Sequence, residues 1–310
     1  MKVLVTCPPM LRLIEEFRSA FQEKSIELVT PNVVQTLSEE ELVGLVPTVD
    51  GWIIGDDPAT EKVFAAGKSG KLRAAVKWGV GVDNVNFEAC KKLGIPVSNT
   101  PQMFGEEVGG LAVHYVIGLA RQTFLIDRGV RNGSWLKPAG ISLEGRTVAL
   151  IGFGDIGKST ARMLHAFRMK VNVYDPFAPK TPADEANYQF LDFPEALEIA
   201  DFVVITCALT PQTRHLVNAN SLEKMKNGVR IVNVSRGGII DETALIRAIT
   251  EGRVHSAALD VFETEPLPEN SELRKFENCI FGTHNGSNTV DAVRRASQEA
   301  MKLMFGFLGV

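Results

Sequence analysis

Three glycines, Gly152, Gly154 and Gly157, have the G-x-G-x-x-G spacing of a turn that holds phosphate groups. The apolar β-type run Thr147–Ile151 leads into them, and a helix-like stretch of about residues 155–167 follows. Within a βαβ unit, such a turn places a dinucleotide pyrophosphate on the free N–H groups of the helix N-terminus. The alternative is a structural glycine turn in an α/β fold that has lost its ligand.

Each glycine in this turn has its own steric reason. Gly152 permits the tight turn, Gly154 leaves no Cβ between backbone and pyrophosphate, and Gly157 lets helix and strand pack closely. A second strand-like run, Val171–Tyr174, then leads to Asp175. A carboxylate at this position would accept the ribose hydroxyls and repel a 2′-phosphate, which predicts NAD as the cofactor in preference to NADP.

A bound nicotinamide needs a proton donor or acceptor and an anion anchor for the substrate. Arg236 follows a strand-like run that ends at Asn233, and two glycines come directly after it. Ligands of parallel sheets bind at this edge, where the guanidinium could hold a carboxylate and the adjacent carbonyl. A surface arginine in a glycine turn is the alternative.

Acids and a histidine follow two later strand-like runs. Asp260 ends the first run, and Glu263 and Glu265 follow it; alone, they would indicate a solvated loop. His284 comes just after the next run, between glycines, and an imidazole transfers protons near neutral pH. The glycines, the strand end and a nearby acid favour function at His284, whereas the other four histidines fit structural positions.

The elements that must position these residues are short apolar runs that alternate with longer periodic ones, which predicts a parallel α/β architecture. The first set of expected strands is Val3–Thr6, Glu27–Thr30, Trp52–Ile54, Ala74–Lys77 and Pro96–Ser98. The second set is Val148–Ile151, Val171–Tyr174, Phe202–Thr206, Arg230–Asn233, Ser256–Asp260 and Cys279–Phe281. Two such sets predict two domains.

Helical spacing of apolar residues marks the longer segments. We expect helices over Leu11–Lys24, Phe87–Leu93, Glu106–Asp127 and Thr289–Leu308. Ser38 followed by Glu41 predicts a capping box at the start of another helix.

Composition excludes several classes of protein. The net charge of −4 gives no electrostatic case for nucleic acid or an anionic membrane as a partner. Four widely spaced cysteines argue against a disulfide framework or a metal site and fit a reducing cytoplasm. The short apolar N-terminal run indicates a first strand and not a signal peptide, and no run reaches membrane-spanning length.

Seven motifs together resemble the D-isomer-specific 2-hydroxyacid dehydrogenases, a family that includes phosphoglycerate dehydrogenases, glyoxylate/hydroxypyruvate reductases and D-lactate dehydrogenases. The resemblance extends over nearly the whole chain. The motifs are Gly79–Asn84, Asn99–Pro101, Gly152–Gly157, Thr210–Thr213, Asn233–Gly238, Leu259–Pro266 and His284–Thr289.

The resemblance implies a role for each catalytic candidate. Arg236 would bind the substrate carboxylate and keto oxygen, and His284 would be the general acid/base. Glu265 would hydrogen-bond His284 and favour its imidazolium form, as a neighbouring carboxylate does. Backbone N–H groups around Val80 and Gly81 would complete the carboxylate clamp.

The resemblance also implies cofactor contacts and an assembly. Besides the three glycines and Asp175, the implied contact positions are Asp155, Ile156, Cys207, Thr213, Val234, Arg236, Asp260, His284 and Gly286. Asp260 would meet the nicotinamide amide. The region 106–146 would form a homodimer through a helix and an arm, in which Trp135 is an expected interface anchor.

Two departures from the family pattern concern the substrate. His284 lies between Thr283 and Asn285, where the family usually has proline and an aliphatic residue. The loop Gly55–Pro58 carries two aspartates where many phosphoglycerate dehydrogenases have an Arg-Ser pair, which suits a phosphate dianion poorly. Lys77 is the nearest basic candidate for substrate binding, so we expect a weaker preference for phosphorylated acids.

The sequence therefore predicts an α/β protein in which a Rossmann-type NAD-binding domain, residues 100–286, is inserted in a flavodoxin-like substrate domain, residues 1–99 plus 287–310. The expected function is NAD-dependent interconversion of a small D-2-hydroxy acid and its 2-keto acid, without a metal. An NAD(H)-sensing binding protein, similar to the C-terminal-binding corepressors, is the alternative.

Overall fold

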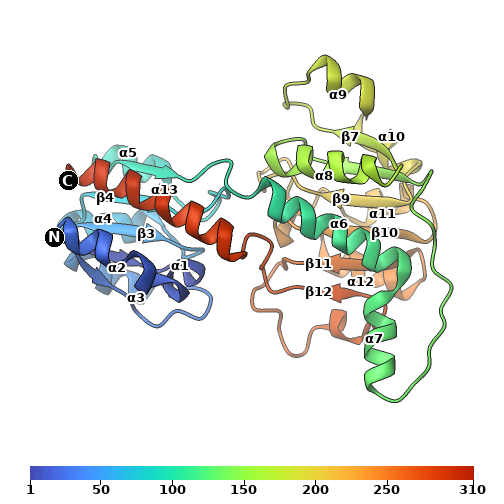
Figure 1. Cartoon of the computed structure of the whole chain (residues 1–310), viewed down its shortest axis with the longest axis horizontal. Coiled ribbons are helices and arrows are strands. Elements are labelled where there is room, and N and C mark those ends of the chain that lie inside the picture. The colour runs from blue at the N-terminus through green and yellow to red at the C-terminus, as the bar shows by residue number, and fades with distance from the viewer. The chain divides into compact units, whose positions relative to one another are not determined.

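The computed structural model describes all residues from 1 to 310, and the chain divides into two compact units (Figure 1). The first unit comprises Met1–Met103 and Asn288–Val310, and the second comprises Phe104–Ser287. The domain boundaries expected from the sequence, 99/100 and 286/287, lie four residues and one residue before these. The chain thus leaves the first unit, builds the whole of the second, and returns.

The first unit contains a five-stranded parallel sheet with the order β2-β1-β3-β4-β5. Its strands are β1 (Lys2–Val5), β2 (Glu27–Val29), β3 (Gly51–Ile54), β4 (Ala74–Lys77) and β5 (Val97–Asn99). This order is that of flavodoxin-like folds, which confirms the predicted class of the substrate domain.

Helices connect these strands, and the last helix of the chain returns to the same unit. They are α1 (Pro8–Arg12), α2 (Ile14–Glu23), α3 (Glu39–Leu45), α4 (Glu61–Ser69), α5 (Phe87–Leu93) and α13 (Val290–Leu308), with a 3-10 turn at Val46–Thr48. The capping box of Ser38 and Glu41 is present at the start of α3. The single helix expected over Leu11–Lys24 is wrong, because the chain leaves helical geometry at Leu13.

The second unit contains a seven-stranded parallel sheet with the order β12-β11-β10-β9-β6-β7-β8. Its strands are β6 (Thr147–Ile151), β7 (Lys170–Tyr174), β8 (Gln189–Phe190), β9 (Phe202–Ile205), β10 (Val229–Asn233), β11 (Val254–Leu259) and β12 (Ile280–Phe281). From β8 to β11 this is the Rossmann order 3-2-1-4-5-6, which reverses direction between β6 and β9. The predicted Rossmann class is confirmed, and the short strand β8 is an addition to the expected set.

Seven helices belong to the second unit. They are α6 (Gly105–Arg121), α7 (Thr123–Arg131), α8 (Asp155–Ala166), α9 (Pro182–Asn187), α10 (Phe193–Glu198), α11 (Ala219–Lys224) and α12 (Glu242–Thr250), with 3-10 turns at Gly237–Ile239 and Glu272–Lys275. The single helix expected over Glu106–Asp127 is wrong. Gln122 adopts a left-handed conformation, with φ of 54°, and separates α6 from α7.

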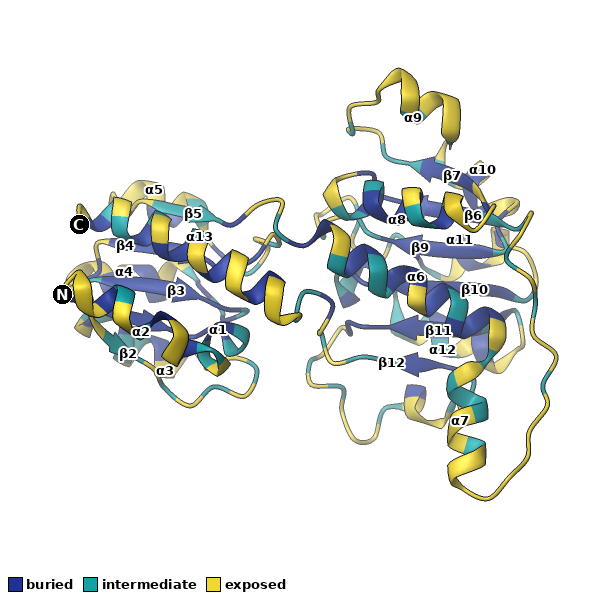
Figure 2. Cartoon of the chain, viewed as in Figure 1, coloured by how far each residue is buried: buried dark blue, intermediate teal, exposed yellow.

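Most strands of both sheets are dark blue in Figure 2, since they are buried, whereas the short strands β2, β5 and β8 are partly exposed. The strand β9 is buried along its whole length, as a continuous apolar run in a parallel sheet should be. The exposed faces of the helices and the helix α9 are yellow in the same view. No helix combines the length and apolarity that crossing a membrane requires.

Candidate active site

The glycine turn between β6 and α8 has the geometry that its spacing predicts. Gly152 has a φ of 99°, and a Cβ there would lie 2.5 Å from the backbone nitrogen of Cys207. A Cβ on Gly157 would lie 2.2 Å from the carbonyl oxygen of Gly152, so only glycine allows α8 to pack this close to the turn. A Cβ on Gly154 would meet no atom within 4 Å. The middle glycine is therefore not needed for packing and leaves open space at the turn.

The N-terminus of α8 is open to an anion. Gly154 is its N-cap, and no side chain accepts a hydrogen bond from the first turn. The first N–H groups of a helix have no partner within the helix and carry the positive end of its dipole. Asp155 and Ile156, two predicted cofactor positions, lie in this first turn.

The carboxylate of Asp175, which follows β7, is held by three backbone N–H groups. Its Oδ2 accepts from Phe153 at 2.8 Å, and its Oδ1 accepts from Phe177 and Ala178, each at 2.9 Å. The Phe153 bond ties the end of β7 to the glycine turn. Because a carboxylate has about four acceptor sites, Asp175 keeps capacity for a further donor such as a hydroxyl.

A cavity of about 270 Å³ lies beside Asp175. Apolar and acidic side chains share its wall, and Lys180 lies 4.4 Å from the ring centroid of Phe190. The lining residues are Val173, Tyr174, Asp175, Pro176, Lys180, Phe190, Leu191, Asp192 and Glu195. The cavity is thus large enough for a planar ring system and carries acceptors at its rim.

Arg236 follows β10, and its loop is fixed by side chains around it. The amide of the buried Asn233 donates to the carbonyl of Arg236 at 2.9 Å and accepts from the N–H of Ser235 at 3.0 Å. The guanidinium itself donates to the Ser235 carbonyl at 2.9 Å. A Cβ on Gly237 would lie 1.8 Å from the carbonyl carbon of Phe262. Glycine is therefore required for the Arg236 loop to lie against the segment that leads to Glu265.

His284 and Glu265 form the pair that the sequence predicts. The Nδ1 of His284 lies 2.8 Å from Oε2 of Glu265, and the two side chains are 22% and 21% exposed. The other carboxylate oxygen of Glu265 accepts from the N–H of Phe262 at 3.0 Å. His284 itself has a φ of 54°, and its N–H donates to the carbonyl of Asp260 at 2.7 Å.

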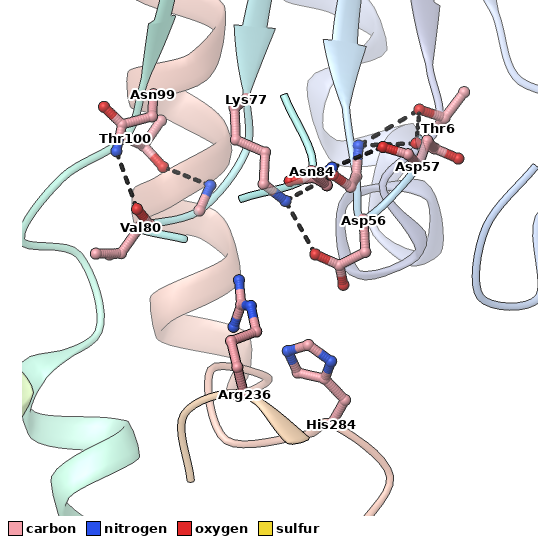
Figure 3. Close-up of polar contacts among 12 residues, drawn as sticks. Thr6, Asp56, Asp57, Lys77, Val80, Asn84, Asn99, Thr100, Arg236 and His284 are labelled. Carbon is pink, nitrogen blue, oxygen red and sulfur yellow. Dashed lines mark hydrogen bonds and ion pairs between the residues drawn. The ribbon is translucent and has the colours of Figure 1, made fainter. Parts of the chain in front are cut away.

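Arg236 and His284 belong to different loops at the same edge of the sheet. Figure 3 shows their side chains extending from these loops in the same direction. Arg236 follows β10 and His284 follows β12, and both strands are parallel to β11, after which Glu265 comes. The parallel sheet therefore brings a guanidinium, a carboxylate and an imidazole to one edge.

Asp260 is buried, with 1% of its surface exposed, and supports the histidine loop. Its Oδ2 accepts from the N–H of Gly286 at 2.8 Å, and its Oδ1 lies 3.4 Å from the hydroxyl of Tyr115. Burial, and next the negative charge of Asp260, raise the pKa of Tyr115. Asp260 thus fixes the loop that carries His284, while its contact with a nicotinamide amide remains a prediction.

Three further predicted cofactor positions lie on loops at the same edge. Cys207 packs against Gly152, and burial raises its pKa to about 12, so its thiol is protonated at neutral pH. Thr213 closes a turn, since its hydroxyl accepts from the N–H of Thr210 at 2.7 Å. Val234 is buried. Their contacts with a cofactor remain predictions.

In the first unit, Lys77 lies at the end of β4 and is only 2% exposed. Its ammonium donates to the carbonyl of Gly55 at 2.6 Å and to Oδ1 of Asp56 at 3.0 Å (Figure 3). The amide of Asn84 donates to the same Gly55 carbonyl at 3.1 Å and to that of Asp57 at 2.7 Å. Lys77 therefore braces the loop after β3 and has an acidic partner.

The two aspartates of this loop have different environments. Asp57 is buried, and it accepts from the N–H of Leu37 at 2.9 Å, from that of Gly55 at 3.0 Å, and from the hydroxyl of Thr6. Burial raises the pKa of Asp57 despite these donors. Asp56 remains half-exposed, so it alone presents a carboxylate from this loop to solvent.

The segment with Val80 and Gly81 is held from β5. The N–H of Gly79 donates to the hydroxyl of Thr100 at 2.8 Å, and the amide of Asn99 donates to the Val80 carbonyl at 3.2 Å. Gly79 has a φ of 125°, which favours glycine. These two bonds engage the N–H of Gly79 and the carbonyl of Val80. They fix the segment that carries the N–H groups of Val80 and Gly81.

Sequence reasoning missed one contact near Glu265. His215 Nε2 lies 2.5 Å from Oε1 of Glu263, and the N–H of Glu263 donates to Oε1 of Glu242 at 2.6 Å. No local pattern indicates that residues 215, 242 and 263 meet. No group of three His, Cys, Asp or Glu side chains in the chain is arranged to hold a metal ion.

The second unit combines a Rossmann sheet and an open glycine turn with an arginine, a glutamate and a histidine at the strand ends. This combination is typical of nicotinamide-dependent dehydrogenases. Residues 113–286 match the model of the D-isomer specific 2-hydroxyacid dehydrogenase NAD binding domain, which covers more than half of the chain. The chain belongs to the D-isomer-specific 2-hydroxyacid dehydrogenase family, and NAD is its cofactor.

Individual relatives agree with this family. The chain is 36% identical to a hydroxypyruvate reductase of Thermotoga maritima, over 88% of this chain and 90% of the relative. It is 38% identical to a D-3-phosphoglycerate dehydrogenase of Synechocystis, over 83% of this chain but only 46% of that protein. A solved structure of a Thermus thermophilus protein superposes with a TM-score of 0.88 at 29% identity, over 100% of this chain and 97% of the other.

Proposed function

We propose that the chain reduces a small, unphosphorylated 2-keto acid to its D-2-hydroxy acid, and catalyses the reverse oxidation, with His284 as the general acid/base. The observation that carries this proposal is the 2.8 Å contact of His284 with Glu265. The segment that leads to Glu265 packs against the loop of Arg236. The similarity to a hydroxypyruvate reductase along nearly its whole length supports this reaction.

The His284 ring is oriented for proton transfer. Glu265 engages Nδ1, and in this proposal Nε2 faces the substrate oxygen. The carboxylate stabilises the charged ring, so the imidazolium can donate its Nε2 proton to the C2 oxygen during reduction. In oxidation the neutral ring accepts that proton from the C2 hydroxyl.

Arg236 anchors the acid in this proposal. Its guanidinium would bind the substrate carboxylate and the C2 oxygen, and would offset negative charge that develops on that oxygen. The backbone N–H groups of Val80 and Gly81 would also donate to the carboxylate.

The residues of the second unit fit NAD. The uncapped N-terminus of α8 and the open space at Gly154 suit a pyrophosphate, and Asp175 has acceptor capacity for ribose hydroxyls. The cavity beside Asp175 has room for the adenine end of the molecule. When bound, NADH supplies the hydride that C2 receives.

The environment of Lys77 supports an unphosphorylated substrate. A phosphate dianion needs free cationic donors, but Lys77 is buried and paired with Asp56. The half-exposed Asp56 would repel a dianion, whereas a hydroxymethyl group or a hydrogen on C2 meets no such penalty. Hydroxypyruvate and glyoxylate fit this description.

We also propose that two chains form a homodimer in the cytoplasm through α6, α7 and the arm that follows. The arm carries Trp135, which is 80% exposed, next to the partly exposed Leu136. Large apolar side chains exposed together indicate an interaction surface.

The proposed function is tested by the loss of NADH absorbance with glyoxylate, hydroxypyruvate, phosphohydroxypyruvate, pyruvate and 2-oxoglutarate. We expect turnover of an unphosphorylated acid and weak use of NADPH. A kcat/KM for phosphohydroxypyruvate far above that for hydroxypyruvate would contradict the substrate class. Failure of every acid, despite NADH binding, would contradict the function and favour a sensing role.

A further inference from the structure

A second histidine–carboxylate pair is formed by His215 and Glu263, and Glu263 lies two residues before Glu265 of the first pair. His215 Nε2 is 2.5 Å from Oε1 of Glu263, and Glu265 bonds His284. His215 belongs to the long loop after β9, far from Glu263 in sequence. The pair therefore joins this loop to the segment 262–265, which carries the partner of the catalytic histidine.

The backbone of Glu263 is held as firmly as its side chain. Its N–H donates to Oε1 of Glu242, in the first turn of α12, at 2.6 Å. On its other side, a Cβ on Gly237 would lie 2.4 Å from the same backbone nitrogen. Glu263 is thus fixed between α12 and the Arg236 loop.

His215 is itself anchored to the same region. Its N–H donates to the carbonyl of Gly238 at 2.9 Å, and its carbonyl accepts from the amide of Asn218 at 2.8 Å. It adopts a left-handed conformation with a φ of 50°. These backbone bonds fix the position from which the side chain of His215 reaches Glu263.

The segment 262–265 also requires such support because it gathers negative charge. Glu242, Glu263 and Glu265 lie close together, and burial and then the charges of Glu263 and Glu265 raise the pKa of Glu242. Like charges repel, and a loop that carries them would open unless it is tied down. His215 is the donor that faces this group from the β9 loop, and His284 faces it from the β12 loop.

We propose that His215, Glu263 and Glu242 are positioning residues that hold the segment 262–265, so that Glu265 stays hydrogen-bonded to His284. The inference rests on the proposed function of His284. It assigns a mechanistic role to a contact in which neither partner is expected to touch the substrate.

The test compares His215→Ala, Glu263→Ala and Glu263→Gln with Glu251→Ala, which breaks an exposed ion pair with Arg247 at the C-terminal end of α12. Reduction needs protonated His284, so activity falls as pH rises through the pKa of that ring. Loosening Glu265 lowers this pKa, and the alkaline limb of the kcat/KM profile moves to lower pH. We expect this shift in both alanine variants, with a loss of about 10-fold in kcat, less than the ~100-fold of a 1 Å misplacement.

Two comparisons separate positioning from charge and from simple loss of stability. Glu263→Gln can still bond His215 and should retain the wild-type profile, as should Glu251→Ala. His215→Ala leaves the charge of Glu263 in place, so a shift there cannot come from removing a negative charge near His284. In a Glu265→Gln variant, the additional change His215→Ala should cause no further shift of the alkaline limb of the kcat/KM profile. Alanine variants that are less stable or less active, but have an unchanged pH limb, would overturn the proposal.

A measurement without turnover separates this proposal from the proposed function. The ring of His284 is followed by NMR in protein labelled at histidine Cε1, with assignment from His284→Gln. We expect its pKa to be lower in His215→Ala and Glu263→Ala than in wild type. If wild type reduces no keto acid but this difference is seen, the proposed function fails and the positioning role stands. An unchanged titration overturns the positioning role, whatever the turnover.

Discussion

The side chains at the strand ends of β10, β11 and β12 are of two kinds: some would contact the substrate, and others hold those side chains in place. Glu265 engages Nδ1 of His284, and the proposed mechanism uses Nε2. Asp260, although strand ends often carry ligand-binding acids, has its carboxylate engaged by Gly286 and Tyr115. The proposed chemistry therefore depends on a few side chains, such as His284 at 22% exposure, that buried hydrogen bonds support.

Asp56 controls the charge that Lys77 offers. Replacing it in Asp56→Ala removes one partner of the ammonium, although the bond to Gly55 remains. We expect kcat/KM for phosphohydroxypyruvate to rise relative to that for hydroxypyruvate, by about tenfold if ~1.4 kcal/mol of repulsion is removed. Steady-state kinetics with both acids measure the ratio. Glu61→Ala, which removes an exposed charge from the same unit, is the control, and an unchanged ratio in Asp56→Ala would refute the role of Asp56.

Glu242 should make the folded state less stable as pH rises, which is the opposite of the effect of an ion-paired carboxylate. Its pKa is raised, mainly by burial, so ionisation in the folded state is penalised. The folded state is therefore favoured below the ordinary pKa of the group and loses this stability as pH rises through the folded value. Glu242→Gln keeps an acceptor for the N–H of Glu263 and removes the charge. We expect its Tm to exceed that of wild type by about 2 °C near pH 8 but to match it near pH 4. A difference that is constant with pH would contradict this assignment.

At the scale of elements, two glycines of the turn between β6 and α8 are expected to have different roles, Gly157 in packing and Gly154 in cofactor binding. Gly157→Ala places a Cβ against the Gly152 carbonyl, so we expect both a lower Tm and weaker NADH binding. Gly154→Ala meets no neighbour, so we expect an unchanged Tm. NADH affinity should nevertheless fall by about tenfold or more, because the Cβ would occupy the space that we propose for the pyrophosphate. Fluorescence titration and thermal melts measure the two effects, and unchanged NADH binding in Gly154→Ala would contradict the proposed cofactor site.

The sequence predicts those elements whose signal is local. Strands such as β9 are continuous apolar runs, and the strand ends identify Arg236 and His284 as candidates because parallel strands end at one edge. The break between α6 and α7 has no such signal. Gln122 adopts a left-handed conformation, and no glycine or proline in the sequence indicates it.

Contacts between distant segments are the other part that sequence alone does not give. His215 and Glu263 are 48 residues apart, and no periodicity connects them. Lys77 is visible as a basic residue, but its burial and its bond to Asp56 depend on how two strand-end loops meet. Such properties follow from the fold and not from spacing.

For the whole molecule, the proposed dimer depends on the exposed arm. Trp135→Glu places a charge where an apolar anchor is expected, and we predict a monomer in light scattering coupled to size-exclusion chromatography. Phe177→Ala removes another aromatic ring, which is 89% exposed but lies outside the arm, and should leave the dimer intact. Wild-type protein that is monomeric at micromolar concentration would refute the proposed assembly.

The central claim is that His284 transfers the proton at C2, and a single-turnover experiment tests it most directly. Enzyme saturated with NADH is mixed with the best keto acid in a stopped-flow instrument, for wild type and for His284→Gln. The predicted result is a loss of about 100-fold or more in the rate of NADH oxidation, with unchanged affinity for NADH. A His284→Gln variant that oxidises NADH within a few-fold of the wild-type rate would contradict the account.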